Sequence, residues 1–203
     1  MNLLGIITAR AHSTIITHKN LKKIKNKFLV EITMDFVKQI NYLSDVIITS
    51  NSKKIISLAY KKKFKFVEKR PRGLSSKFSR SSDTVIHAVK WYENKFKKKV
   101  DAIALFQPTT PFRDLKFINK CIEVFFNNKK TVVSSPINNF KRKFKMSDGS
   151  IYLINKNDLI RLRSFNELNA KKVYSRNNIN SIDIDNFEDL EKAQRLASIF
   201  KII

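Results

Sequence analysis

The chain has 203 residues, and its hydrophobic content of 42% excludes a disordered protein and allows one domain with a substantial core. The apolar run Leu3–Ala9 is too short to span a bilayer and follows no basic segment, so we expect neither a membrane helix nor a signal peptide. The single cysteine, Cys121, excludes an internal disulfide and predicts a buried, inert thiol, which favours a cytoplasmic location.

The charge is strongly basic, with 41 Lys and Arg against 17 Asp and Glu and a net charge of +24. Such a charge is typical of proteins that bind nucleic acid or anionic surfaces. However, Lys, Ile, Asn and Phe are all abundant while Gly and Pro are scarce, as an AT-rich coding sequence would favour. The lysines are also spread along the chain, so we favour compositional bias and keep nucleic-acid binding as the alternative.

Short apolar runs alternate with amphipathic ones along the chain. The predicted strands are Leu3–Ala9, Val46–Ser50, Phe64–Glu68, Ala102–Phe106, Thr131–Ser134, Ser150–Ile154 and Ser181–Asp183. The predicted helices are Phe28–Asn41, Lys53–Lys62, Asp83–Phe96, Leu115–Asn127 and Phe187–Phe200. This alternation predicts a three-layer α/β fold with a mostly parallel central sheet and helices on both faces. Because no repeat or linker interrupts the pattern, residues 1–203 are predicted to form one domain.

The loop after the first strand is a candidate phosphate-binding segment. No glycine lies between Gly5 and Gly73, which excludes the dinucleotide fingerprint and the P-loop in this part of the chain. Arg10 can instead bind a phosphate through two N–H groups, Lys19 can add a positive charge, and Ser13 can donate a hydrogen bond. A solvated basic loop without a ligand is the alternative.

A proline-rich turn follows the strand Ala102–Phe106. Pro108 and Pro111 stiffen the chain there and fix the position of Gln107, whose amide can bind sugar hydroxyls or a carboxylate. A rigid turn without a ligand is the alternative.

Two carboxylates, Asp183 and Asp185, precede the last predicted helix. One apolar residue separates them, so in a strand they would lie on the same face and could hold Mg²⁺ against phosphate oxygens. Alternatively, Asp185 or Asn186 could cap the final helix.

The order of these motifs resembles the acylneuraminate cytidylyltransferases, the CMP-sialic acid synthetases, over nearly the whole chain. The matching segments are Ala9 to Ser13 with Lys19-Asn20, Arg70 to Ser75 with Ser81-Ser82 and His87-Ala88, Gln107 to Arg113, Asp148 to Tyr152, and Ser181 to Leu190. The resemblance implies the Rossmann-like fold of nucleotide-diphospho-sugar transferases.

It also implies an activity, the transfer of CMP from CTP to an acidic nine-carbon sugar with release of pyrophosphate, as in cell-surface carbohydrate biosynthesis. By position, Arg10 and Lys19 would hold the triphosphate, and Ser13 with Asn20 would shape the loop. The remaining implied contacts are Arg70 and Ser81 with the cytidine half, Gln107 with the sugar, and Asp183 with Asp185 for Mg²⁺.

The chain departs from the family pattern in several places. Thr14 replaces a lysine after the loop serine, and Lys77 replaces an acidic residue. The stretch near 135–148 is shorter than in relatives and lacks most of their dimer-forming excursion, so a homodimer is not firmly implied. A degenerate paralogue that binds nucleotide or sugar without turnover is therefore an alternative function, as is a basic nucleic-acid-binding protein. A 3-deoxy-manno-octulosonate cytidylyltransferase is the nearest enzymatic alternative.

Overall fold

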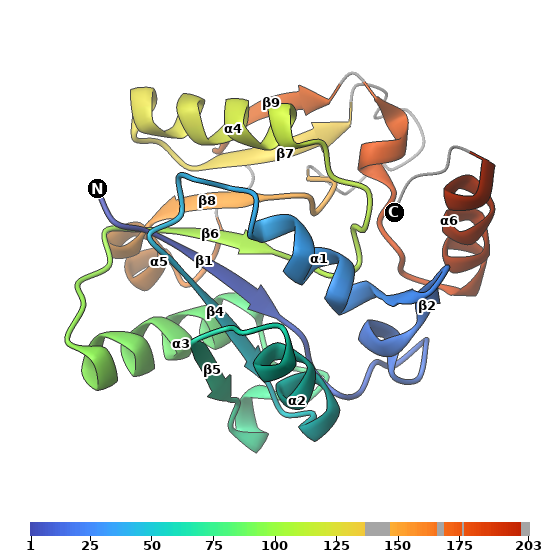
Figure 1. The fold of residues 1–203 in the computed structure, drawn as a ribbon. Coiled ribbons are helices and arrows are strands. Elements are labelled where there is room, and N and C mark those ends of the chain that lie inside the picture. Colours follow the sequence, from blue (N-terminus) through green and yellow to red (C-terminus); the bar gives the residue numbers. More distant parts are fainter. Residues whose placement is uncertain (137–146, 166–168, 176, 200–203) are drawn as a thin grey trace.

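The computed structural model describes residues 1–136, 147–165, 169–175 and 177–199, and its centre is a seven-stranded sheet in the order β5-β4-β1-β6-β8-β7-β9 (Figure 1). The strands are β1 (Leu3–Thr8), β4 (Asp45–Ser50), β5 (Phe66–Lys69), β6 (Ala102–Phe106), β7 (Val132–Pro136), β8 (Tyr152–Asn155) and β9 (Lys171–Ser175). A separate hairpin pairs β2 (Lys23–Ile24) with β3 (Lys27–Phe28).

Only β8 runs against its neighbours, so the sheet is mostly parallel, as the strand–helix alternation predicts. The chain starts at β1, moves outward to β4 and β5, and then returns to β6 on the other side of β1. Ile6 therefore pairs with Ile47 on one side and with Leu105 on the other. This reversal is a topological switch point, where open α/β sheets place their ligands beyond the carboxyl ends of the strands.

Helices cover both faces of the sheet (Figure 1). The helices are α1 (Leu29–Val37), α2 (Lys53–Lys61), α3 (Ser81–Phe96), α4 (Leu115–Asn128), α5 (Lys156–Leu162) and α6 (Phe187–Ile199). Side chains of α1, α2 and α4 share one apolar cluster with one face, and side chains of α3 and α5 share a second cluster with the other. Alternate residues of β1 enter the two clusters, Ile7 the first and Ile6 the second, because successive strand side chains point to opposite faces.

The helix α6 packs apart from these layers. Its apolar residues Leu190 and Ala193 join Ile24 of the β2–β3 hairpin and Ile32 of α1 in a third cluster. None of the helices in the described ranges is long and apolar enough to cross a membrane.

The fold differs from the sequence prediction in several elements. Ser181–Asp183 is not a strand: a 3₁₀ turn ends at Ser181, and the chain then runs extended without a ladder partner, held by the amide of Ile184, which donates to the carbonyl of Thr109 at 2.8 Å. The edge strand β9 and the helix α5 were missed because each is short and rich in lysine or polar residues. The β2–β3 hairpin, only two residues per strand, was missed for the same reason.

The segment near 135–148 lies mostly outside the described residues, so its shortening and the loss of a dimer-forming excursion stay predictions. Cys121, in contrast, is fully buried on α4, as expected. Burial raises the pKa of its thiol to about 12, which leaves it protonated and unreactive at neutral pH.

Candidate active site

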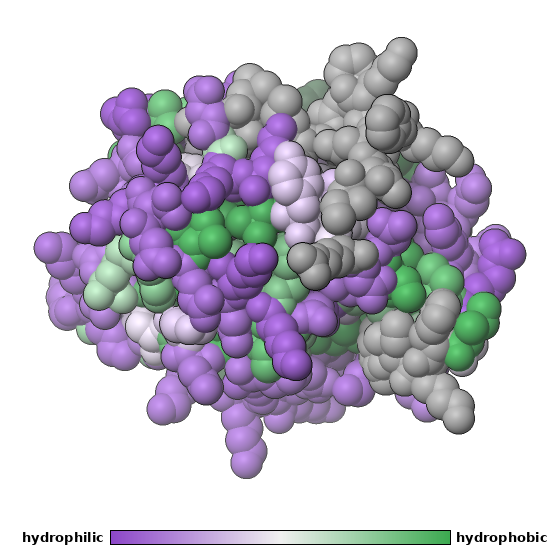
Figure 2. All heavy atoms as spheres, turned by 90° about the horizontal axis from the view of Figure 1, so that it is seen from above, coloured by the Kyte–Doolittle hydropathy of each residue, from purple (hydrophilic) through white to green (hydrophobic). Residues whose placement is uncertain are grey.

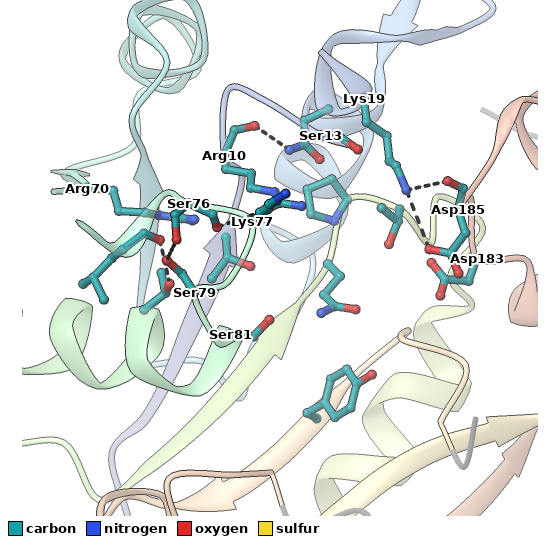
Figure 3. Close-up of a pocket in the computed structure, with 18 of the residues that line it drawn as sticks. Arg10, Ser13, Lys19, Arg70, Ser76, Lys77, Ser79, Ser81, Asp183 and Asp185 are labelled. Carbon is teal, nitrogen blue, oxygen red and sulfur yellow. Dashed lines mark hydrogen bonds and ion pairs between the residues drawn. The ribbon is translucent and has the colours of Figure 1, made fainter. Parts of the chain in front are cut away.

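A cavity of about 430 Å³ lies beyond the carboxyl ends of the parallel strands, at the switch point (Figure 3). All the site residues predicted from the sequence line it, namely Arg10, Ser13, Lys19, Asn20, Arg70, Ser81, Gln107, Asp183 and Asp185. They come from segments that are far apart in the chain. Arg10, Arg70 and Gln107 follow β1, β5 and β6, parallel strands that end at the same edge. Nine residues of the lining were predicted from the sequence but not others, such as Ser76, Ser79 and Thr84, and the contacts among them could not be read from the sequence.

The loop after β1 is held to two neighbouring segments. The side-chain amide of Asn20 donates to the carbonyl of Arg10 at 2.9 Å, and Asn51, after β4, accepts from the amide of Ala11 at 2.7 Å. The Nη1 of Arg10 donates to the carbonyl of Ser76 at 3.1 Å. The guanidinium is thus fixed between its own loop and the serine-rich loop that follows β5.

Lys19 connects this loop to the carboxylate segment. Its Nζ donates to the carbonyl oxygens of Ile184 at 2.7 Å and of Asp185 at 3.1 Å, and it lies 3.6 Å from Oδ1 of Asp185. The Lys19 side chain is only 12% exposed, so this charge acts in a partly desolvated place where it is weakly screened. Figure 3 shows it opposite Asp183 and Asp185.

Arg70, directly after β5, is 6% exposed and lines the cavity. Its Nη2 donates to the carbonyl of Thr49 at 2.9 Å and its Nε to the Thr49 hydroxyl at 3.3 Å. Burial lowers the pKa of Arg70 to about 10; the charge of Glu68 opposes this shift, and the charge of Arg10 adds to it. At neutral pH the guanidinium remains charged and faces the same cavity as Arg10.

The serine-rich loop supplies hydroxyl groups to the same wall. The Oγ atoms of Ser76 and Ser79 lie 2.9 Å apart, and the Ser79 hydroxyl also donates to the carbonyl of Gly73 at 2.9 Å. Ser81 begins α3 at the cavity wall. Lys77 also lines the cavity and adds a further positive charge to it.

On the opposite wall, Gln107 lies against Gly149. A Cβ at Gly149 would come within 3.3 Å of Oε1 of Gln107, which is tighter than most real Cβ contacts, so glycine allows the Gln107 amide to lie close to this backbone. Arg113 donates to the carbonyl of Gln107 and, at 2.9 Å, to that of Ser150. Burial lowers the pKa of Arg113 to about 9, while the charges of Asp148 and Asp183 oppose the shift.

The structure thus adds Arg113 and Asp148 as supports of the site, although the sequence offered only their places in the motifs. Asp148, 2% exposed, accepts hydrogen bonds from Ser134 at 2.6 Å, from the amide of Ser150 at 2.9 Å and from Ser181 at 3.1 Å. It therefore joins β7, the segment just before β8 and the turn that leads to Asp183.

The Asp183 and Asp185 carboxylates both line the cavity, even though no strand holds them. Asn186 caps the first turn of α6, because its Oδ1 accepts a hydrogen bond from the amide of Asp189 at 2.9 Å. Among the residues that the structure describes, no group of three or more His, Cys, Asp or Glu could hold a metal ion. Two carboxylates nevertheless fit Mg²⁺, which usually takes one or two protein carboxylates and completes its shell with water and substrate phosphates.

The fold and the cavity together define an α/β protein whose site, at a topological switch point, is suited to an anionic ligand. A family model described as cytidylyltransferase matches residues 4–200. The chain therefore belongs to the cytidylyltransferase family.

Two relatives agree with this assignment. The CMP-N,N'-diacetyllegionaminic acid synthase of Legionella pneumophila is 26% identical over 98% of this chain and 97% of that protein. The N-acylneuraminate cytidylyltransferase of Escherichia coli O18:K1:H7 is 28% identical over 61% of this chain and 28% of that protein.

Solved structures confirm the fold. A CMP:2-keto-3-deoxy-manno-octonic acid synthetase complexed with CTP matches with a TM-score of 0.72 at 11% identity, over 98% of this chain and 100% of that one. A cytidylyltransferase from Leptospira borgpetersenii matches with a TM-score of 0.69 at 18% identity, over 98% of this chain and 88% of that one.

Proposed function

We propose that this protein transfers CMP from CTP to an acidic sugar of the nonulosonic class, forming a CMP-activated sugar and pyrophosphate. The observation that carries the proposal is that one cavity combines Arg10, Lys19 and Arg70 with the carboxylates Asp183 and Asp185. The names of the two relatives refer to nonulosonic acids, whereas the name of the solved synthetase refers to an eight-carbon octonic acid, so the names agree on an acidic sugar and differ in which one.

The chemistry is a displacement at the α-phosphate by a sugar hydroxyl. It needs little covalent help from the protein but much positioning and neutralisation of charge. Arg10 and Lys19 would bind the triphosphate and stabilise the charge that develops on the departing pyrophosphate. Gln107, held by Arg113 through its carbonyl, would orient the sugar.

Mg²⁺ would be held by Asp183 and Asp185 and, when bound, would neutralise phosphate charge and lower the pKa of the attacking hydroxyl. The Lys19–Asp185 contact, 3.6 Å between Nζ and Oδ1, keeps one of these carboxylates next to the triphosphate-binding cation. Both groups would then meet the same ligand.

A binding-only paralogue is the second candidate. It is favoured by Lys77, which adds a positive charge to the cavity lining. It is also favoured by Thr14, which stands where the resemblance implies a lysine, although Thr14 does not line the cavity. A single assay separates the candidates: pyrophosphate release from CTP and Mg²⁺ with a panel of nonulosonic acids and 3-deoxy-manno-octulosonate, at moderate salt. Pyrophosphate release that requires one particular sugar supports the transferase function and identifies that sugar as the substrate. If no sugar of the panel gives pyrophosphate release while calorimetry still detects CTP binding, the binding-only function is supported.

The carboxylate assignment predicts that Asp183→Asn or Asp185→Asn lowers turnover about a hundredfold or more, because either change removes a ligand for the charge-neutralising ion. The unfolding temperature should change far less. Asp158→Asn is the matched control, since this aspartate pairs only with Arg161 on the surface of α5 in the described contacts. Unchanged turnover in the double variant would refute the assignment.

A further inference from the structure

Glu68, on β5, is a buried carboxylate that the proposed reaction does not use. It is 1% exposed and does not line the cavity. Burying a carboxylate is costly unless it is paired and hydrogen-bonded. One of its oxygens has such a contact: Oε2 accepts a hydrogen bond from the hydroxyl of Thr49. The other, Oε1, lies 3.0 Å from Nδ1 of His87, and neither of these two atoms makes a hydrogen bond among the described residues.

Thr49 links this carboxylate to the cavity. Its hydroxyl donates to Glu68 and accepts from Nε of Arg70 at 3.3 Å, while its carbonyl accepts from Nη2 of Arg70 at 2.9 Å. A guanidinium has five N–H donors, and these contacts use two of them. The rest of the group can serve the cavity that Arg70 lines.

The direction of the Thr49 hydroxyl is the important feature. A hydroxyl has one proton, and when Glu68 accepts it the oxygen lone pairs are left for Nε of Arg70. The negative charge of Glu68 also compensates the buried guanidinium, which lies near the like charge of Arg10. Glu68 therefore acts on Arg70 in two ways: it orients the Thr49 hydroxyl that contacts Arg70, and its negative charge stabilises the guanidinium.

We propose that Glu68 and Thr49 are positioning residues that fix the Arg70 guanidinium for the cytidine half of CTP, an inference that rests on the proposed function. His87, on α3, lies beside Glu68 with a side chain that is 40% exposed, and it makes no hydrogen bond to that carboxylate. It reaches Glu68 but has no described contact with Arg70, so its replacement should matter less.

The test compares Thr49→Val, which removes the hydroxyl, with Thr49→Ser, which keeps it. Calorimetry with CTP and Mg²⁺ should show about a tenfold weaker affinity for Thr49→Val and for Glu68→Gln, the size expected for one lost hydrogen bond to a charged group. Thr49→Ser should bind CTP within about twofold of the parent, and His87→Gln should fall between. Affinity for inorganic tripolyphosphate, which lacks the cytidine half, should not change.

A double-mutant cycle separates positioning from a structural role. In an Arg70→Lys background, where the paired contact to Thr49 is lost, Thr49→Val should weaken CTP binding by less than about twofold. A full tenfold loss in that background, or a parallel loss of tripolyphosphate affinity, would show a structural role and overturn the inference. Unchanged CTP affinity in both Thr49→Val and Glu68→Gln would also overturn the inference. A parent protein that binds no CTP would instead overturn the proposed function.

Discussion

At the scale of single residues, Gly149 shows how tightly the site is built. Its φ of +81° lies in the left-handed region, and a Cβ there would come within 2.9 Å of Oγ1 of Thr110. Thr110 is fully buried and donates to the carbonyl of Asp148 at 3.3 Å, so it has little room to move away. Glycine at this position is therefore a requirement of both backbone and packing.

Gly149→Ala should lower the free energy of unfolding by about 1–3 kcal/mol, because it combines backbone strain with a steric clash. CTP-dependent turnover should fall too, since Gln107, whose Oε1 a Cβ would meet at 3.3 Å, would have to shift. Chemical denaturation measures the first effect. The control is Gly73→Ala, where a Cβ meets nothing within 4 Å and stability should change by less than about 0.5 kcal/mol. Equal stabilities of the two variants would contradict this reading.

The buried cations were the residues that sequence reasoning described least well. Arg113 stands at the end of the proline-rich motif, yet nothing in the motif indicates that its guanidinium would turn inward and hold carbonyls of Gln107 and Ser150. Lys19 was predicted as a phosphate ligand, but its contacts with Ile184 and Asp185 join positions more than 160 residues apart. Such contacts depend on the fold and cannot be inferred from local sequence.

At the scale of elements, α1 and α2 are joined by a charge cluster. Asp35 on α1 accepts from Lys62, just after α2, at 2.7 Å and from Lys27 on β3 at 3.0 Å. Partial burial raises the pKa of Asp35, but the hydrogen bonds and charges of Lys62 and Lys27 outweigh it, so the pKa lies below its usual 3.8. The ionised carboxylate therefore stabilises the folded state.

Asp35→Asn should cost about 1 kcal/mol of folding free energy at neutral pH. Because the folded pKa is depressed, this contribution is complete above the unfolded pKa and is lost as the pH falls through the folded value. Urea denaturation from pH 6 to pH 3 should therefore show the variant and the parent converging at the acid end. Asp158→Asn, which breaks an exposed pair within α5, should change little at any pH. A difference that stays constant down to pH 3 would contradict the assignment.

Elements with a strong pattern were predicted well, and weakly patterned ones were not. The helices α2 and α4 were placed to within a residue at each end, because each has a side chain, Ser52 or Asp114, that caps its first turn. The segment after Ser181 was wrong as a strand, since its extended backbone has no neighbour to form a ladder. Period-two spacing predicts that Asp183 and Asp185 lie on one side, but pairing depends on the rest of the sheet.

At the scale of the whole molecule, the 41 Lys and Arg are spread along the chain rather than gathered in one segment. Figure 2 shows hydrophilic side chains spread over most of the visible face, with apolar patches among them. The cavity, in contrast, combines cations with two carboxylates. A distributed charge attracts any polyanion weakly and is readily screened by salt, whereas a cavity that also holds carboxylates discriminates among anions.

Arg10→Ala should weaken CTP binding about tenfold or more, because it removes a charge-assisted phosphate contact. The same change should alter the affinity for a single-stranded oligonucleotide by less than about twofold, and that affinity should largely disappear by about 0.3 M salt. Fluorescence anisotropy and calorimetry measure the two affinities. Lys90→Ala, on an exposed position of α3, is the control for loss of one charge. Oligonucleotide binding that resists salt and falls with Arg10→Ala would favour a nucleic-acid function.

The sequence by itself determined the fold class, because hydrophobic periodicity specifies alternating strands and helices whose parallel strands end at one edge. Local chemistry, together with the family resemblance of the motifs, identified nine of the residues that line the cavity. The tertiary structure alone decided how those residues are held: Lys19 against the Asp183–Asp185 segment, and Arg70 through Thr49 to the buried Glu68. These are contacts between distant segments, and their geometry follows from close packing and from satisfying buried polar groups, which no local pattern encodes.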